Sequence, residues 1–138
     1  TKKMSKSDLS DLSRINLTDD NDLIVNKIRK AKTDSKPMPN TEDSLEKRPE
    51  AENLLGVYSS LSNQDLKKTI KDFSGKNFSE FKEKLSELLV QKIGPISKEI
   101  RKLLNDQKYL DDILFEGSAK ADKISSKKIK EMKELIGF

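Results

Sequence analysis

The apolar residues of this chain recur at intervals of three and four positions, which is the period of an α-helix. Only five glycines and four prolines interrupt its 138 residues. Amphipathic helices joined by short connections predict an all-α fold, an antiparallel helical bundle. We expect helices at residues 20–32, 50–60, 63–74, 78–104, 106–115 and 118–136.

The first of these helices has clear signals at both ends. Its apolar stripe is Ile24, Ile28 and Ala31, and basic residues gather near its end. Thr18 or Asp19 could cap its start, and acidic residues suit the positive end of a helix dipole. The same region can also be interpreted as a metal-binding carboxylate cluster of Asp19, Asp20 and Asp22, but a helix start explains these residues without a metal.

Two later positions predict interruptions. Gly94-Pro95 predicts a kinked or restarted helix whose continuation, with Ile96 and Leu104, keeps the same core face. Gly117 predicts the end of the helix at 106–115. In the last helix the residues expected to point inward are Ala121, Ile124, Met132, Leu135 and Ile136.

Residues 33–49, TDSKPMPNTEDSLEKRP, differ in composition from the rest of the chain. Three of the four prolines lie here, among small polar residues without apolar period. This segment is predicted to be a linker or a long surface loop, which is usually either functional or mobile.

The composition excludes several kinds of site. Without cysteine there are no disulfides or thiolate metal sites, and without histidine there is no imidazole base or zinc site. The net charge of +4 is compatible with a nucleic-acid partner but does not require one. No apolar run approaches the roughly 20 residues of a membrane span, and no signal peptide is visible. We expect no metal site, no membrane partner and a cytoplasmic protein.

Lysines and aromatic residues could in principle form a nucleic-acid surface. Lys120, Lys123, Lys127 and Lys130 share one face of the last helix, which suits a phosphate backbone. However, seven acids and seven lysines lie from Asp106 onward, so a solvated helix face is the favoured interpretation. Nearly all aromatic residues fall at predicted core positions, which argues against base stacking.

The segment Lys3-Met4-Ser5-Lys6-Ser7 has two physical interpretations. It could be a solvated tail, or a loop whose two ammonium groups contact different oxygens of one polyphosphate. Such a loop would stabilise charge on departing pyrophosphate, as adenylate formation requires. Because Thr1 is not methionine, we expect the chain to begin within a longer protein. Composition alone leaves both interpretations open.

The order KMSKS is the second signature motif of class I aminoacyl-tRNA synthetases. The surrounding TKKMSKSDLSDLSRINLTDD resembles the corresponding part of bacterial tryptophanyl-tRNA synthetases, and tyrosyl-tRNA synthetases are the runner-up. The similarity continues through AKTDS, NLLGVYSSLS, FSGKNFSEFKEKL, KIGPI and YLDDILFEGSAKA, so it covers essentially the whole chain. Leu9 replaces a common proline, and Arg48-Pro49-Glu50 replaces a more usual Lys-Pro-Gly.

The resemblance implies the C-terminal portion of a homodimeric tryptophan-tRNA ligase that uses ATP and Mg²⁺. Such an enzyme makes tryptophanyl-adenylate and then charges tRNA(Trp). Residues 1–17 would be the KMSKS loop and the edge of the catalytic domain. Residues 18–138 would be the helical tRNA- and anticodon-binding domain, with the long loop at 33–49. The Rossmann catalytic domain, the tryptophan pocket and the dimer contacts would lie upstream.

By the same resemblance, Lys3 and Lys6 are the catalytic lysines that bind ATP phosphates. Ser5 and Ser7 supply supporting hydroxyls, and Met4 supplies a backbone contact to ATP. These residues alone cannot position tryptophan, so the isolated chain is predicted to be inactive. The alternative is a free-standing helical module that binds RNA or protein without catalysis.

Overall fold

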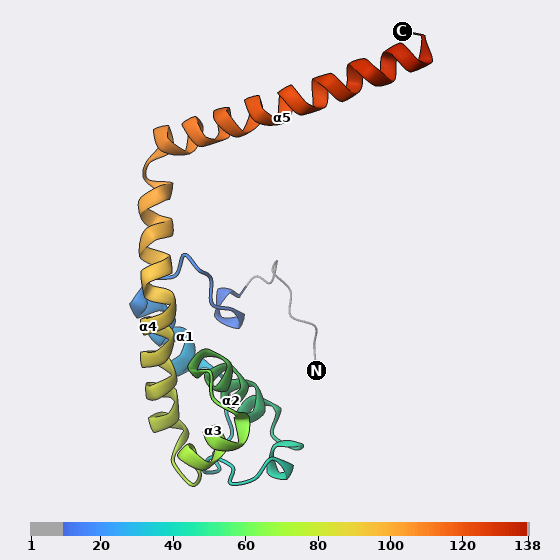
Figure 1. Cartoon of the computed structure of the whole chain (residues 1–138). Helices are drawn as coiled ribbons and strands as arrows, with labels where there is room; N and C mark the ends of the chain where they lie inside the picture. The colour runs from blue at the N-terminus through green and yellow to red at the C-terminus, as the bar shows by residue number, and fades with distance from the viewer. Residues whose placement is uncertain (1–9, 138) are drawn as a thin grey trace. The chain divides into compact units, whose positions relative to one another are not determined.

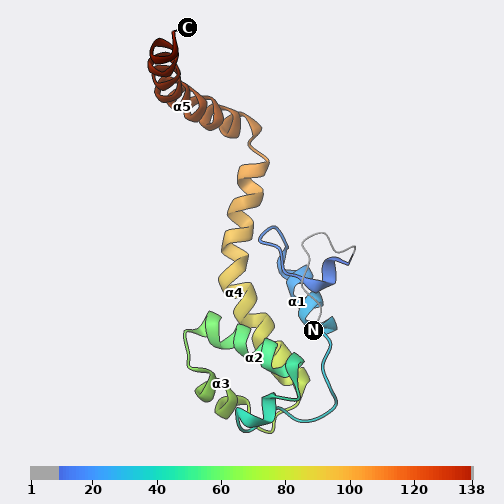
Figure 2. The same ribbon diagram turned by 90° about the vertical axis from the view of Figure 1, so that its right-hand side faces the viewer.

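The computed structural model describes residues 10–137, which form helices and no strand (Figure 1 and Figure 2). The all-α prediction is therefore confirmed. The described residues divide at residue 98 into two compact units. The α-helices are α1 (Asn21–Lys30), α2 (Pro49–Ser62), α3 (Leu66–Phe73), α4 (Phe78–Leu104) and α5 (Gln107–Ile136), and two 3-10 helices are η1 (Asp11–Ser13) and η2 (Asp43–Leu45).

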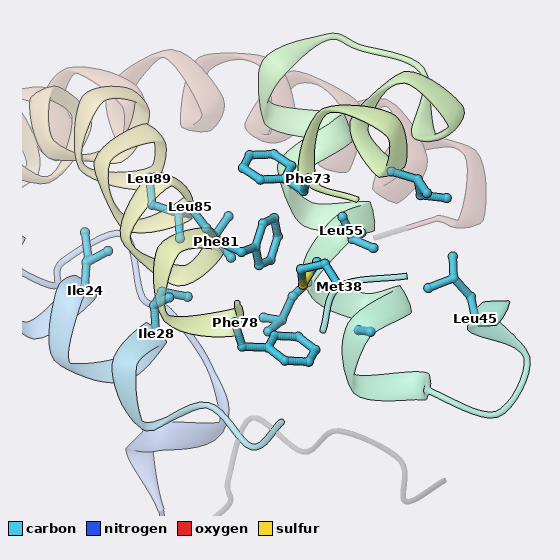
Figure 3. Packing of buried hydrophobic residues seen from close by; sticks show 13 residues of the cluster. Ile24, Ile28, Met38, Leu45, Leu55, Phe73, Phe78, Phe81, Leu85 and Leu89 are labelled. Carbon is cyan, nitrogen blue, oxygen red and sulfur yellow. The ribbon is translucent and has the colours of Figure 1, made fainter. Parts of the chain in front are cut away.

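The first unit has a hydrophobic core to which helices α1 to α4 and the loop before α2 all contribute (Figure 3). Phe81 of α4 is fully buried and contacts the rings of Phe73 and Tyr58. The Phe73 and Phe81 centroids lie 4.8 Å apart in an edge-to-face arrangement, the geometry that aromatic quadrupoles favour. The buried apolar residues are Ile24, Ile28, Met38, Leu45, Ala51, Leu54, Leu55, Ile70, Phe73, Phe78, Phe81, Leu85 and Leu89.

The helix ends follow from local chemistry. The carboxylate of Asp20 accepts a hydrogen bond from the backbone N–H of Leu23, so Asp20 caps α1 in place of the predicted Thr18 or Asp19. Pro49 occupies the first turn of α2, where the missing donor costs nothing. Helix α2 ends at Ser62, and the left-handed backbone of Asn63 caps its last turn.

Residues 33–48 form a loop that includes η2, and side chains fix this loop to the rest of the first unit. The guanidinium of Arg48 donates to both carboxylate oxygens of Asp34, each at 2.8 Å. The backbone N–H of Gly75 donates to the carbonyl of Met38, whose side chain is buried in the core. The contact between Asp34 and Arg48 therefore joins the two ends of the loop. The hydrogen bond between Met38 and Gly75 joins the loop to the turn after α3.

Helix α4 continues through Gly94 and Pro95 from Phe78 to Leu104. Of the two predicted alternatives, a kinked or a restarted helix, the restart is wrong because α4 is continuous. The prediction that Ile96 and Leu104 stay on the core is also wrong, because both are about half exposed. The residue buried beyond Pro95 is Ser97, whose hydroxyl donates to a backbone carbonyl. The missing backbone N–H of Pro95 removes one hydrogen bond, and this loss does not end helix α4.

The second unit contains the end of α4 and helix α5, which runs through Gly117 without a break. The predicted helix end at Gly117 is therefore wrong. The residues of α5 predicted to be inward are exposed, as are Tyr109 and Phe115, which were expected at core positions. Periodicity shows which face of a helix is apolar, but it does not show what covers that face.

Candidate functional site

The five residues of the KMSKS segment, Lys3 to Ser7, lie outside the described residues, as does Leu9. Their predicted contacts with phosphate stay predictions. The structure does describe the chain that follows, from η1 into helix α1. We call this part, residues 11–19, the junction segment. It carries the most buried charged cluster among residues 10–137.

Lys27 of α1 is the centre of that cluster. Its ammonium donates to Asp11 Oδ2 and to Asp19 Oδ2, each at 2.6 Å. The side chains of Lys27 and Asp19 are 2% and 4% exposed, whereas that of Asp11 is 48% exposed. A buried ammonium therefore joins both ends of the junction segment to helix α1.

Asn16 completes the cluster from within the junction segment. Its backbone N–H donates to Asp19 Oδ2 at 2.9 Å, and its side-chain amide donates to Asp11 Oδ1 at 2.9 Å. The backbone N–H of Asp19 in turn donates to the carbonyl of Asn16 at 3.0 Å. The hydroxyl of Ser97 on α4 donates to the carbonyl of Asp19 at 2.6 Å. The junction segment is thus tied to two helices that are far apart in sequence.

The electrostatics of the cluster follow from these contacts. Burial disfavours the charged form of Lys27, but its hydrogen bonds to Asp11 and Asp19 outweigh burial and raise its pKa above the usual 10.5. The hydrogen bond from Lys27, followed by that from Asn16, lowers the pKa of Asp11 below 3.8. Lys27 is therefore held as a cation, and it cannot serve as a base or reach a phosphate in solvent.

A groove of about 850 Å³ lies between α1 and α4 in the same unit. At its edge the ammonium of Lys82 donates to the carbonyls of Ala31 at 2.6 Å and Arg29 at 3.3 Å, where α1 ends. Partial burial lowers the pKa of Lys82. The residues that line the groove carry both signs of charge: Val25, Arg29, Thr33, Phe78, Ser79, Lys82, Glu83, Ser86, Glu87 and Val90. The groove shows no preference for an anion.

Sequence reasoning missed the roles of Lys27 and Asp19. Asp19 was assigned to a helix start, and only its neighbour Asp20 caps the helix. A signal was nevertheless available, because Lys27 falls between Ile24 and Ile28 on the apolar stripe of α1. A lysine at such a position is either a snorkelling stem or a paired cation.

The lysines of helix α5 are exposed, and two of them pair with acidic residues of the same helix. Lys120 pairs with Glu116 at 3.7 Å, and Lys128 pairs with Glu131 at 2.7 Å. Lys123, Lys127 and Lys130 are exposed on the same helix. Exposed pairs of this kind contribute little to stability. No helix of the described chain is long and apolar enough to cross a membrane.

Comparison with known proteins decides the family. Residues 1–93, which include the KMSKS segment and the junction segment, match the family described as "tRNA synthetases class I (W and Y)". The chain belongs to this family. The class I synthetase chain is 46% identical to the tryptophan–tRNA ligase of Brucella melitensis over all 138 residues. It is 49% identical to that of Agrobacterium fabrum over 138 residues, and 48% identical to that of Rickettsia felis over 137 residues.

The synthetase chain spans about two fifths of the length of these relatives, from 39% to 41%. The matches to these relatives nonetheless cover 99–100% of the present chain, including helix α5. The resemblance predicted from the ordered motifs is therefore confirmed at the level of the family.

Proposed function

We propose that this chain is the C-terminal part of a tryptophan–tRNA ligase, which activates tryptophan with ATP and transfers it to tRNA(Trp). The observation that carries the proposal is the 44–49% identity to tryptophan–tRNA ligases along the whole chain. An unaltered KMSKS sequence within that alignment supports it. A family match alone would leave tryptophan and tyrosine open, whereas the relatives named here are all tryptophan enzymes.

In the proposed first step, a carboxylate oxygen of tryptophan attacks the α-phosphorus of ATP. A new oxygen–phosphorus bond forms as the bond to the β-phosphate oxygen breaks, and its electron pair leaves with pyrophosphate. Lys3 and Lys6 would neutralise charge that grows on this leaving group. Ser5 and Ser7 would donate hydroxyl hydrogen bonds, and Met4 a backbone contact. In the second step a ribose hydroxyl oxygen of tRNA attacks the carboxyl carbon of the adenylate. The bond from this carbon to the phosphate oxygen breaks, AMP leaves with the electron pair, and the hydroxyl proton is released.

The division of labour is part of the proposal. Residues 1–17 would complete the ATP site of an upstream nucleotide-binding domain, and residues 18–138 would bind tRNA. The described residues offer no group of three acidic side chains that could hold a metal ion. Mg²⁺ would arrive with the phosphates of ATP. Dimerisation would occur through the upstream domain, and the enzyme would act in the cytoplasm.

The proposal is tested by tryptophan-dependent ATP–pyrophosphate exchange in the complete enzyme. Lys6→Ala should lower the exchange kcat by about 10²–10³-fold, the usual cost of one lost transition-state donor. The KM for tryptophan should change much less. Lys30→Ala, an exposed lysine of α1, is the matched control and should leave exchange intact. An unchanged turnover number for Lys6→Ala would contradict its assigned role.

The isolated chain of residues 1–138 tests the division of labour between a catalytic domain and a helical domain. It should show no exchange, because the chain carries no pocket assigned to tryptophan. Tyrosine-dependent exchange by the complete enzyme would reassign the substrate. Robust exchange by residues 1–138 alone would overturn the division between a catalytic domain and a helical domain.

A further inference from the structure

Asp11 is the fourth residue after Ser7, the last residue of the KMSKS segment. Because an extended residue adds at most about 3.6 Å to the reach of a chain, four residues can reach no further than about 15 Å. A fixed Asp11 therefore limits the space that the chain before it can sample. The position of Asp11 is set by its contacts with Lys27 and Asn16 and by the guanidinium of Arg14, which lies 3.1 Å from Asp11 Oδ1.

The arrangement of the cluster is more than the core requires. Asp19 and Lys27 already satisfy each other at 2.6 Å in a buried position. The second contact of Lys27 reaches out to Asp11, which is about half exposed and belongs to no buried layer. The hydrophobic core does not need the contact between Lys27 and Asp11. The clear effect of this contact is to attach η1 to helix α1.

We propose that Asp11 and Lys27 are positioning residues for the KMSKS segment, and that their ion pair fixes the point at which this segment joins the helical body. This inference rests on the proposed function of that segment. Neither residue touches ATP. A fixed attachment lowers the conformational entropy that is lost when the two KMSKS lysines are ordered on the phosphates. It also keeps those lysines within the small tolerance that catalysis allows.

The test uses Asp11→Asn in the complete enzyme, because Lys27 is buried and its replacement could prevent folding. This change removes the charge at a half-exposed side chain, and with it the ion pairs to Lys27 and Arg14, and leaves the Lys27–Asp19 pair in place. In tryptophan-dependent exchange, kcat/KM for ATP should fall about tenfold, within the roughly 100-fold that a misplacement of about 1 Å can cost. The KM for tryptophan should not change, and the free energy of unfolding should fall by less than about 1 kcal/mol.

Two further variants give the controls. Asp22→Asn makes the same chemical change at an exposed residue of α1 and should have wild-type kinetics. Asp11→Glu retains the carboxylate and should recover most of the lost activity. A structural role alone would lower the fraction of active sites, as counted by the adenylate burst, and would leave the KM for ATP unchanged.

A double-mutant cycle with Lys6→Ala decides whether Asp11 acts through the loop. If it does, Asp11→Asn should have little further effect once Lys6 is gone, because the two act on one contact. Three results would overturn the inference. The effects of Asp11→Asn and Lys6→Ala could multiply, Asp11→Asn could leave the kinetics with ATP unchanged, or it could lower kcat/KM equally for ATP and tryptophan. A wild-type enzyme without tryptophan-dependent exchange, or a fully active Lys6→Ala variant, would remove the proposed function and this inference with it.

Discussion

Replacement of Lys27 by methionine should destabilise the first unit by about 3 kcal/mol. The methionine fills a similar volume, so the main cost is the loss of the buried cation. Asp19 would keep its hydrogen bond from the Asn16 backbone at 2.9 Å but lose its only charged partner among the described residues. Breaking a buried ion pair on one side costs about 3–5 kcal/mol, and the remaining donor places this case at the lower end.

A second replacement tests that reasoning. In Lys27→Met with Asp19→Asn, no unpaired buried charge remains, so about 1–2 kcal/mol should be recovered relative to Lys27→Met alone. Asp11→Asn should cost less than about 1 kcal/mol, because its side chain is half exposed. Equal losses for the single and the double variant would refute the idea that a stranded carboxylate causes the instability.

Urea unfolding followed by tyrosine fluorescence measures these differences. The chain has no tryptophan and two tyrosines, one in each unit. Tyr109→Phe leaves Tyr58 as the reporter for the first unit, where its ring packs 4.8 Å from that of Phe73. The free energy then refers to one cooperative unit, which is the condition for a two-state treatment.

The pH dependence has a definite sign. The pKa of Lys27 is raised on folding, so its contribution is complete below about 10.5 and is lost as pH rises through the folded value. The pKa of Asp11 is lowered, so its contribution is present above about 3.9 and is lost as pH falls through the folded value. The difference between wild type and Lys27→Met should therefore shrink above about pH 10.5. A constant difference up to about pH 11.5 would contradict this account.

The remaining predictions concern the buried ring of Phe81 and the glycines Gly75 and Gly56. Phe81→Ala should cost about 3–5 kcal/mol in the same urea assay, because its fully buried ring contacts Phe73, and Phe81→Leu should cost clearly less; equal costs would mean that the cavity is not the cause. Gly75→Ala should cost about 1 kcal/mol, because Gly75 has φ +72° and open space around it, so strain rather than a clash sets the penalty. Gly56→Ala, in helix α2 with equal space, should instead be stabilising.

The sequence predicts helix positions well where a stripe faces the core. In α1 the residues Ile24 and Ile28 are buried as expected. The prediction failed at Gly117 because one glycine costs a helix only about 1 kcal/mol, which its flanking residues can offset. The prediction of an inward face for α5 failed because an apolar period shows the direction of that face but does not show which residues cover it.

For the candidate site the sequence and the structure supply different parts. The KMSKS segment was found from residue order alone and lies outside the described residues. The Lys27 cluster was found only in the structure, because its partners Asp11 and Asp19 lie 16 and 8 residues away. No local pattern reports a contact that depends on how the junction segment turns back onto α1.

The closure of the 33–49 loop by Arg48 and Asp34 has a practical consequence. The residues between these two side chains form a ring whose base is fixed. The tip of this ring at residues 40–42 is exposed and meets α3 through the exposed Glu42–Lys67 pair at 3.9 Å. Lengthening a loop costs only about 0.6 kcal/mol per doubling. This tip is therefore the place to insert a fluorophore-bearing peptide or an affinity tag into the synthetase, at a distance along the chain from both the KMSKS segment and α5.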